Sequence, residues 1–377
     1  MSYKIALILN GDRSLSSFPS ACNAGRLLSK NGYEVTFFLP IDMKIDCVVE
    51  CAEFVRFRRT RPAFMGIFKV LVTHARRYDL LIAFDSAELI SSGLIGVIYK
   101  IPFVFFSLEI IGSDQIKTIK GRIIKYIEIF FSKKAAFIIV QDEVRKKLIK
   151  NTYEIYDNRI FCLPNSYIGI IKKTTNYLRD KFNIPNNKVI VLYAGGIESW
   201  AIDRSLIDAV CEWGDEYVLV LHGWSRCGYL HELKPLIDKV NYSKERIYLS
   251  LDMLNEEEYG ACVSSANIGL AWYKKDLSEN VAKIGLSSGK CASFLRCGLP
   301  VIVPSYLEGI GELVSKYQFG ISADNEFKIK DAVALIMKNY QTYRDNAFNF
   351  CLNFLDYEKG FNDVLPEIHV LTRRKRR

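Results

Sequence analysis

A short polar run in the second half of the chain, Gly285-Leu286-Ser287-Ser288-Gly289-Lys290, has the residue types of a phosphate-binding loop. We expect it to open a short helix over 290–296, which Gly298 ends before a buried strand begins at Val301. The first N–H groups of a helix have no acceptor within it, and the helix dipole is positive there. Ser288, Gly289 and Lys290 therefore predict a site for an anionic phosphate group, with an ordinary surface helix start as the alternative.

A glycine pair, Gly195-Gly196, follows an apolar strand expected at 188–193. Because glycine has no side chain, the backbone can approach a phosphate group closely at such a point. A plain strand-to-helix turn is the alternative interpretation. Glu198 and Trp200 come next along the chain and are candidates to line the same site, although a tryptophan is often simply part of a core.

The composition excludes several classes of protein. The chain has 377 residues, of which 50% are hydrophobic and 25% are charged, enough for two domains with sizeable cores. Its ten cysteines show no CxxC spacing and it has four histidines, which argues against a zinc framework and for buried thiols in a reducing compartment. We expect no signal peptide and no membrane span. No carboxylate–x–carboxylate motif ends a strand, so no metal is expected.

The net charge of +9 is concentrated in the first half of the chain and in the terminal run Arg373-Arg374-Lys375-Arg376-Arg377. This distribution predicts an anionic partner for the first half, with an ordinary solvated surface as the alternative. Nucleic acid is not the expected partner, because the chain has no recognition motif and its basic residues are not interleaved with runs of aromatic residues.

Strands and helices alternate along the first half of the chain, which is typical of a parallel sheet built from βαβ units. The apolar runs and turn residues predict strands at 4–9, 34–39, 54–57, 79–84, 103–108, 136–141 and 159–163. The helices between them are expected at 20–31, 63–77, 87–99, 115–132 and 142–151.

Pro164-Asn165-Ser166 ends this series, and the pattern restarts after a polar connector. Strands are expected at 188–193, 217–222, 246–249 and 268–272, and helices at 205–213, 230–239, 256–264, 312–317 and 328–354. The fold class is therefore α/β, with two Rossmann-like doubly wound parallel-sheet domains and a ligand in the cleft between them. We place the domains at 1–166 and 167–345, followed at 346–377 by a helix that packs back towards the first domain and a basic tail.

Several segments, taken in order, resemble the GT-B glycosyltransferases, in particular the family 4-like (group 1) bacterial sugar transferases. The matching segments are 138–145 with 163–166, 189–196, 266–271 with 288–302, and 312–320. The resemblance covers essentially the whole chain. It implies an acceptor-binding first domain, a second domain that binds a nucleotide-sugar donor (a UDP- or GDP-sugar as co-substrate), and no other cofactor.

Two departures from the family pattern concern the donor loop. The family often carries two glutamates eight residues apart, and the matching positions here are Gly285 and Ser293. The family also often has an arginine and a lysine soon after the glycine turn, and residues 197–200 here supply neither. Lys290 is the candidate to carry the diphosphate charge instead.

Individual residues of the second half are candidates for roles at such a donor site. Gly195, Gly196, Ser288, Gly289 and Lys290 would hold the donor's diphosphate. Glu312 would accept hydrogen bonds from ribose or sugar hydroxyls, Asn280 would contact the sugar, and His222 would lie near the base or ribose. The alternatives are a helix-start acid for Glu312 and a structural histidine for His222.

In the first half, Gly11, Asp12 and Arg13 follow the first strand, at the position of a loop that faces donor and acceptor in GT-B proteins. Turn chemistry alone is the alternative for this segment. Glu109 follows the strand expected at 103–108 and is the candidate catalytic carboxylate, which would position or deprotonate an acceptor hydroxyl. The alternative for Glu109 is a capping or surface acid.

The helix expected at 115–132 is amphipathic and basic. Its apolar residues are Ile116, Ile119, Ile123, Ile127 and Phe130, and its flanking basic residues are Lys117, Lys120, Arg122 and Lys125. Such a helix can lie on an anionic membrane surface. A helix packed on the core with a solvated basic face is the alternative.

Together these features predict a cytoplasmic glycosyltransferase, peripheral at the inner face of the cell membrane. It would move a sugar, with retention, to a hydroxyl of a glycan or lipid-linked glycan in surface polysaccharide biosynthesis (capsule, O-antigen or exopolysaccharide). The alternatives are a nucleotide-sugar epimerase or hydrolase on the same fold, and a non-catalytic partner subunit of another transferase.

Overall fold

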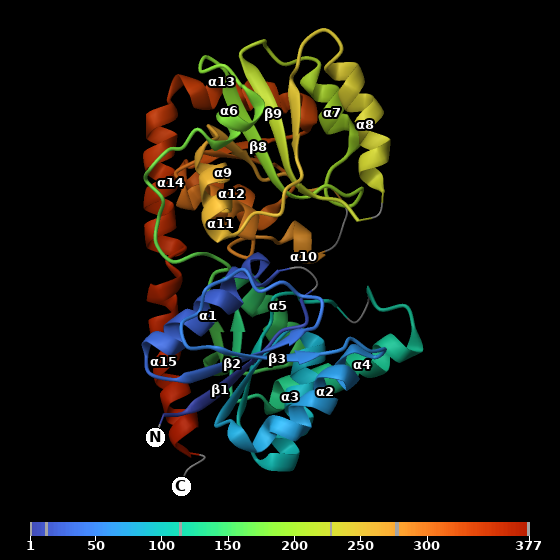
Figure 1. The fold of residues 1–377 in the computed structure, drawn as a ribbon, viewed down its shortest axis with the longest axis vertical. Coiled ribbons are helices and arrows are strands. Elements are labelled where there is room, and N and C mark those ends of the chain that lie inside the picture. Colours follow the sequence, from blue (N-terminus) through green and yellow to red (C-terminus); the bar gives the residue numbers. More distant parts are fainter. Residues whose placement is uncertain (1, 12–13, 113–114, 227, 276–278, 375–377) are drawn as a thin grey trace. The chain divides into compact units, whose positions relative to one another are not determined.

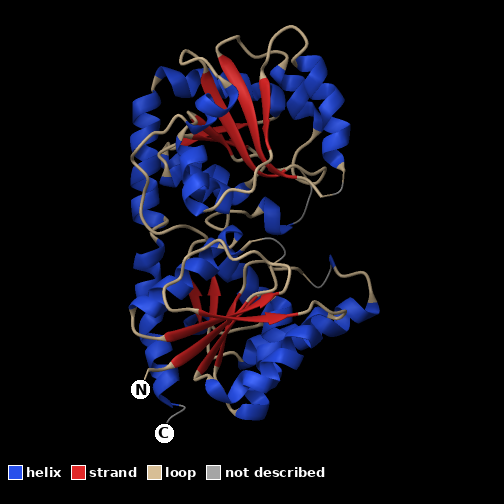
Figure 2. Cartoon of the chain, in the orientation of Figure 1, coloured by secondary structure: helices blue, strands red, loops and turns tan. Residues whose placement is uncertain are grey.

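The computed structural model describes residues 2–11, 14–112, 115–226, 228–275 and 279–374. It divides the chain into two compact units, Met1–Ile168 with Tyr357–Arg377, and Gly169–Asp356. Each unit is a parallel β-sheet with helices on both of its faces (Figures 1 and 2). The doubly wound α/β class expected from the sequence is therefore confirmed.

The first unit contains a seven-stranded sheet in the order β3-β2-β1-β4-β5-β6-β7. Its strands are β1 Lys4–Ile8, β2 Glu34–Pro40, β3 Glu53–Phe57, β4 Leu80–Phe84, β5 Phe103–Phe106, β6 Ile138–Val140 and β7 Ile160–Cys162. Its α-helices are α1 Pro19–Lys30, α2 Ala63–His74, α3 Ser86–Tyr99, α4 Ile119–Lys134, α5 Glu143–Tyr153 and α15 Tyr357–Arg374. The strand order reverses between β1 and β4, so the loops after these two strands flank the topological switch point, where sheets of this kind bind ligands.

The second unit contains a six-stranded sheet in the order β10-β9-β8-β11-β12-β13. Its strands are β8 Val189–Gly196, β9 Tyr217–Trp224, β10 Ile247–Ser250, β11 Ile268–Leu270, β12 Val301–Pro304 and β13 Gly320–Ala323. Its α-helices are α6 Tyr177–Phe182, α7 Arg204–Val210, α8 Tyr229–Val240, α9 Glu256–Ser264, α10 Glu279–Ala282, α11 Gly289–Arg296, α12 Glu308–Tyr317, α13 Ile329–Lys338 and α14 Tyr340–Phe354. Its switch point lies between β8 and β11.

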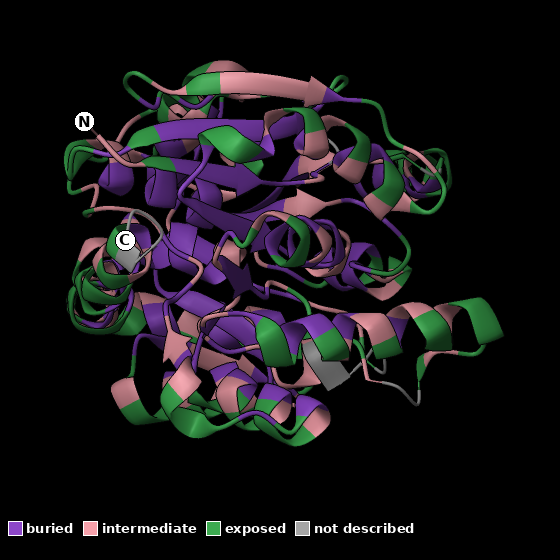
Figure 3. Ribbon diagram, turned by 90° about the horizontal axis from the view of Figure 1, so that it is seen from below, coloured by how far each residue is buried: buried purple, intermediate pink, exposed green. Residues whose placement is uncertain are grey.

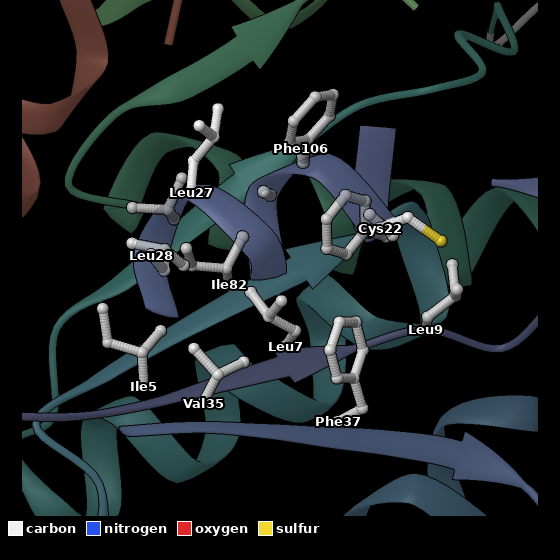
Figure 4. Packing of buried hydrophobic residues seen from close by; sticks show 14 of the residues in the cluster. Ile5, Leu7, Leu9, Cys22, Leu27, Leu28, Val35, Phe37, Ile82 and Phe106 are labelled. Carbon is white, nitrogen blue, oxygen red and sulfur yellow. The ribbon is translucent and has the colours of Figure 1, made fainter. Parts of the chain in front are cut away.

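The packing of each unit follows from the alternation of side chains along its buried strands. In β1 and just beyond it, Ile5, Leu7 and Leu9 face α1 and α15, while Ala6 and Ile8 face the opposite layer. Figure 4 shows the first of these layers, in which Leu27 and Leu28 of α1 pack over the strands. The second sheet also has a separate apolar cluster on each face.

Several elements differ from the sequence expectation. The long helix expected at 328–354 is interrupted at Asn339 and forms α13 and α14, and strand β13 was not expected. Helix α14 belongs to the second unit, so the chain returns to the first unit at Tyr357 and not at residue 346. There the hydroxyl of Tyr357 donates to the carbonyl oxygen of Ser20 in α1 at 2.7 Å, which fixes α15 to the first unit.

Candidate functional site

Helix α11 begins with a capped first turn at the predicted phosphate loop. The hydroxyl oxygen of Ser288 accepts a hydrogen bond from the backbone N–H of Cys291 at 3.1 Å. The hydroxyl of Tyr273 lies 2.5 Å from the same oxygen and fixes its position. Gly289 and Lys290 occupy the first two positions of the helix, whose N–H groups have no acceptor within it. These are the donors that an anion at this end of the helix would engage.

The side chain of Lys290 crosses the switch point of the second sheet. Its Nζ donates to the carbonyl oxygen of Trp272, just after β11, at 3.0 Å. The same ammonium lies 4.0 Å from the ring centre of Tyr193 in β8 and 4.3 Å from that of Tyr273. This enclosure removes water from the ammonium and lowers the pKa of Lys290 to about 7. An anion bound beside Lys290 would favour its charged form.

Two glycines end the neighbouring strands β8 and β9 and lie side by side. Gly195 pairs with Gly223 in the parallel register, and their φ angles are 153° and 152°. A Cβ on Gly223 would lie 1.7 Å from the carbonyl oxygen of Gly195, and one on Gly195 would lie 3.2 Å from Cε of Lys290. The predicted turn at Gly195-Gly196 is therefore wrong in its local structure, because the strand continues through both glycines. They instead let the two strand ends and Lys290 pack together.

Two tryptophans flank Gly196. A Cβ at Gly196 would lie 3.0 Å from the indole of Trp224 and 3.3 Å from the indole of Trp200. Trp200 is 50% exposed, so it is not a core residue. The guanidinium of Arg226 lies 4.8 Å from the ring centre of Trp224. The end of β8 thus has an aromatic wall, a surface on which flat rings and sugar faces can stack.

His222 packs inside the second unit. Its Nδ1 lies 3.0 Å from the hydroxyl oxygen of Ser250 in β10, and its ring stands 5.8 Å from that of Tyr259. Burial lowers the pKa of His222 to about 4, so the imidazole is neutral near pH 7. These are the contacts of a structural histidine, and the predicted place near a base or ribose stays a prediction.

Glu312 is exposed and is the fifth residue of α12, which begins at Glu308. The alternative of a first-turn acid is therefore wrong for Glu312, and Glu308 holds that place. A Cβ on Gly309 would lie 3.0 Å from the carbonyl oxygen of Ile284, so the start of α12 packs against the loop before α11. Asn280 lies in the short helix α10, and its side chain is outside the described part of the structure.

In the first unit, Gly11 is buried after β1, where a Cβ would lie 2.3 Å from the ring of Phe18. Asp12 and Arg13 lie outside the described residues. Glu109 is exposed in the loop after β5, and its backbone N–H donates to Oδ1 of Asp85 at 3.0 Å. Gly11 and Glu109 thus both follow strands near the switch point, as expected from the sequence.

Sequence reasoning missed two carboxyl groups at this edge, Asp85 and Glu88. Asp85 follows β4 directly, with φ of 70°, and accepts hydrogen bonds from the N–H groups of Leu108 and Glu109. Glu88 accepts from the N–H of Asn10 at 2.5 Å, across the switch point. Burial, and next the charge of Glu109, raise the pKa of Asp85 to about 7, and burial raises that of Glu88 well above its usual range. The sequence did offer a signal for Asp85, because it is an acidic residue directly after a buried strand.

Within the described residues, no group of three or more His, Cys, Asp or Glu side chains is arranged to hold a metal ion. The cysteines in this part of the chain are all free thiols. What the second unit assembles at its switch point is a lysine ammonium, a capped helix start and an aromatic wall. Such an array has the groups that can bind and orient an anionic ligand.

No protein-family model matches the sequence, and no curated protein matches it significantly. Solved structures do match its fold. HepE from Anabaena, in complex with UDP and glucose, is 12% identical with a TM-score of 0.75, and the match covers 98% of this chain and 100% of HepE. Sucrose-phosphate synthase from Thermosynechococcus elongatus is 16% identical with a TM-score of 0.73, covering 98% of this chain and 99% of the synthase. The chain has the GT-B fold.

A third GT-B match is WaaG, a glycosyltransferase involved in lipopolysaccharide biosynthesis. It is 14% identical with a TM-score of 0.67, and the match covers 95% of this chain and 98% of WaaG. These matches confirm the fold that the sequence motifs indicated. At such identities the similarity is one of architecture, and the chemistry must be argued from this chain's own residues.

Proposed function

We propose that this protein is a glycosyltransferase that uses a nucleotide-sugar donor bound by its second unit. The observation that carries the proposal is the position of Lys290, whose ammonium lies at the switch point beside Gly195 and at the start of α11. The GT-B fold and a neighbour that binds UDP and glucose support the same assignment. The donor would be a UDP- or GDP-sugar.

The proposed role of Lys290 follows from the charge changes of glycosyl transfer. The bond between the anomeric carbon and the diphosphate oxygen breaks, a bond to the acceptor's hydroxyl oxygen forms, and the proton of that hydroxyl passes to the leaving diphosphate. Negative charge grows on the leaving diphosphate. Lys290 and the N–H groups of Gly289 and Lys290 would stabilise this charge without a metal ion. Trp200 and Trp224 would line the neighbouring part of the site.

The finer features of the proposed reaction rest on other observations. Retention of configuration at the anomeric carbon rests on the sequence motifs shared with family 4-like transferases. An acceptor at the first unit rests on the polar strand ends there, where Asp85, Glu88 and Glu109 lie near one another. The acceptor would be a glycan or lipid-linked glycan of a surface polysaccharide at the inner face of the cell membrane.

The test is the thermal stability of the purified protein against a panel of nucleoside diphosphates and nucleotide-sugars. A ligand at 100 times its dissociation constant adds about 2.7 kcal/mol of stability. We expect the nucleotides of one nucleobase to raise the melting temperature of the unchanged protein. The Lys290→Ala variant should not show this rise. Lys234→Ala, which removes an exposed lysine of α8 in the same unit, should keep it.

Each outcome of this panel has a distinct meaning. No shift with any nucleotide would contradict the donor site and favour a non-catalytic partner subunit. A shift that Lys290→Ala retains would contradict the role of Lys290. Product analysis after incubation with the selected nucleotide-sugar separates the two enzyme alternatives: an isomer, with no transfer to any acceptor, would favour the epimerase.

A further inference from the structure

Helix α4 of the first unit carries an exposed apolar stripe. The side chains of Ile119, Ile123, Tyr126 and Phe130 are 78%, 56%, 74% and 47% exposed. At 100° per residue these four positions fall within about 60° of one another around the helix axis. In Figure 3, α4 is the helix that extends to the right-hand edge, and exposed residues recur along it. The core-packed alternative from the sequence is therefore wrong for Ile119, Ile123 and Phe130, but it holds for Ile127, which is partly buried against the core.

The inward face of α4 combines apolar side chains that pack on the core, Phe131 among them, with polar side chains that make buried contacts. Nζ of Lys125 lies 2.9 Å from Oε1 of Glu128 and 2.6 Å from the hydroxyl of Tyr153 in α5. The hydroxyl of Ser86, at the start of α3, donates to Oε2 of Glu128 at 2.9 Å. Turning the stripe inward would break this buried ion pair and expose the apolar Phe131 that packs on α3. The outward position of the stripe is thus a fixed feature of the fold.

Basic side chains border the stripe on both sides. Arg122 and Lys133 lie on one flank and Lys120 and Lys134 on the other, by the same helical geometry. The single acid of α4, Glu128, is buried against Lys125. Lys133 pairs with Glu154, which directly follows α5, and Lys134 lies 5.0 Å from the ring centre of Phe130. The exposed face of α4 therefore offers apolar side chains and positive charge together.

The same character continues beyond the end of α4. Lys134 also lines a hollow of about 510 Å³ together with Lys100 and Val97 at the end of α3. Val97 and its neighbour Ile98 are exposed. Lys100 and the exposed Val97 thus share this hollow with Lys134, which borders the stripe.

We propose that this face of α4 lies on an anionic lipid membrane, with the four stripe residues in the boundary between headgroups and acyl chains. An apolar face bordered by lysine and arginine is the pattern that binds such a surface, because burial and attraction to lipid phosphate act together. No helix among the described residues is long and apolar enough to cross a bilayer. The inference deepens the proposed function by placing a lipid-linked acceptor beside the enzyme, but the contact itself does not depend on donor binding.

The test is co-sedimentation of the full chain with vesicles of phosphatidylcholine, with and without phosphatidylglycerol. We expect the protein to bind the anionic vesicles and salt to weaken this binding. Ile123→Asp/Phe130→Asp should bind them more weakly by a factor of roughly ten or more. The control, Tyr242→Asp/Leu335→Asp, changes two exposed apolar residues of the second unit and should bind like the unchanged protein. The nucleotide-induced thermal shift, measured on the same samples, reports folding and donor binding separately.

Several results would overturn the proposal. One is no binding of the unchanged protein to anionic vesicles, and another is equal binding by Ile123→Asp/Phe130→Asp. Equal binding to both kinds of vesicle would contradict the role of the basic residues. Loss of binding on deletion of 373–377, with the stripe variant unaffected, would assign the contact to the basic tail. A dimer that the stripe variant converts to a monomer would show that a second copy covers this face.

Discussion

Lys290 of α11 packs against Gly195 of β8, so closely that a Cβ on the glycine would lie 3.2 Å from Cε of the lysine. This contact brings together two sequence features that are 95 positions apart and places the ammonium where the strand order of the second sheet reverses. Neither residue alone identifies a site. Together with the capped start of α11 they form a place for an anionic group.

Binding of a nucleotide-sugar should be linked to proton uptake by Lys290. The pKa of Lys290 is lowered to about 7 in the free protein, so at pH 7 about half of the molecules carry Lys290 as a neutral amine. A bound diphosphate raises this pKa again, and affinity should fall as the pH rises from about 6.5 to 8.5. Calorimetry in two buffers of different ionisation enthalpy measures the uptake. Lys290→Met should abolish it, and uptake that persists in this variant would assign it to another group.

Gly223→Ala should be strongly destabilising. The new Cβ would lie 1.7 Å from the carbonyl oxygen of Gly195, at a φ of 152° that other residues rarely adopt. We expect a loss of more than about 3 kcal/mol in the free energy of unfolding, measured by chemical denaturation. Gly311→Ala is the control, because a Cβ there has no atom within 3.8 Å and the position is helical. It should stabilise the protein by about 0.5–1 kcal/mol, and a similar loss in both variants would contradict the account.

Asp85→Asn should stabilise the protein more at pH 8 than at pH 5. The pKa of Asp85 is raised to about 7 in the folded state from an ordinary value of 3.8, so the folded state binds the extra proton between these values. Stability from this group therefore falls as the pH rises through that window, and is lowest above it. Asparagine can still accept from the N–H groups of Leu108 and Glu109. Denaturation at several pH values tests this, and a constant difference between the two proteins would contradict the raised pKa.

Lys125→Met should be destabilising, because it leaves the carboxylate of Glu128 buried without its ammonium partner. We expect a loss of about 3–5 kcal/mol in the free energy of unfolding. The double variant Lys125→Met/Glu128→Gln removes both charges and should recover part of the loss. A double variant that is no more stable than Lys125→Met would mean that the pair does not act as an ion pair in the fold.

The sequence was informative where residue type alone decides the local structure. Gly298, which has a φ of 68° after α11, was expected as a helix stop, and the helix expected at 290–296 is α11, which begins one residue earlier at Gly289. The alternation of buried strands and helices was enough to expect two doubly wound sheets. In each case the cause is local along the chain, so the pattern can be read without coordinates.

The sequence was less informative where contacts join distant segments. The aromatic partners of Lys290 come from β8 and from the loop after β11, and no spacing links Tyr193 to Tyr273. The orientation of α4 depends on Tyr153 and Ser86, which hold its polar residues inward. An amphipathic pattern alone predicts that the apolar residues of α4 are buried, which holds for Phe131 but not for Ile119, Ile123 or Phe130.

The most direct test of the central claim is a crystal structure of the protein with the nucleoside diphosphate that the thermal panel selects. We predict diphosphate oxygens within hydrogen-bonding distance of Nζ of Lys290 and of the N–H of Gly289, with Nζ turned from the carbonyl oxygen of Trp272 towards the ligand. A nucleotide bound elsewhere, with Lys290 still donating to Trp272, would contradict the assignment of this site.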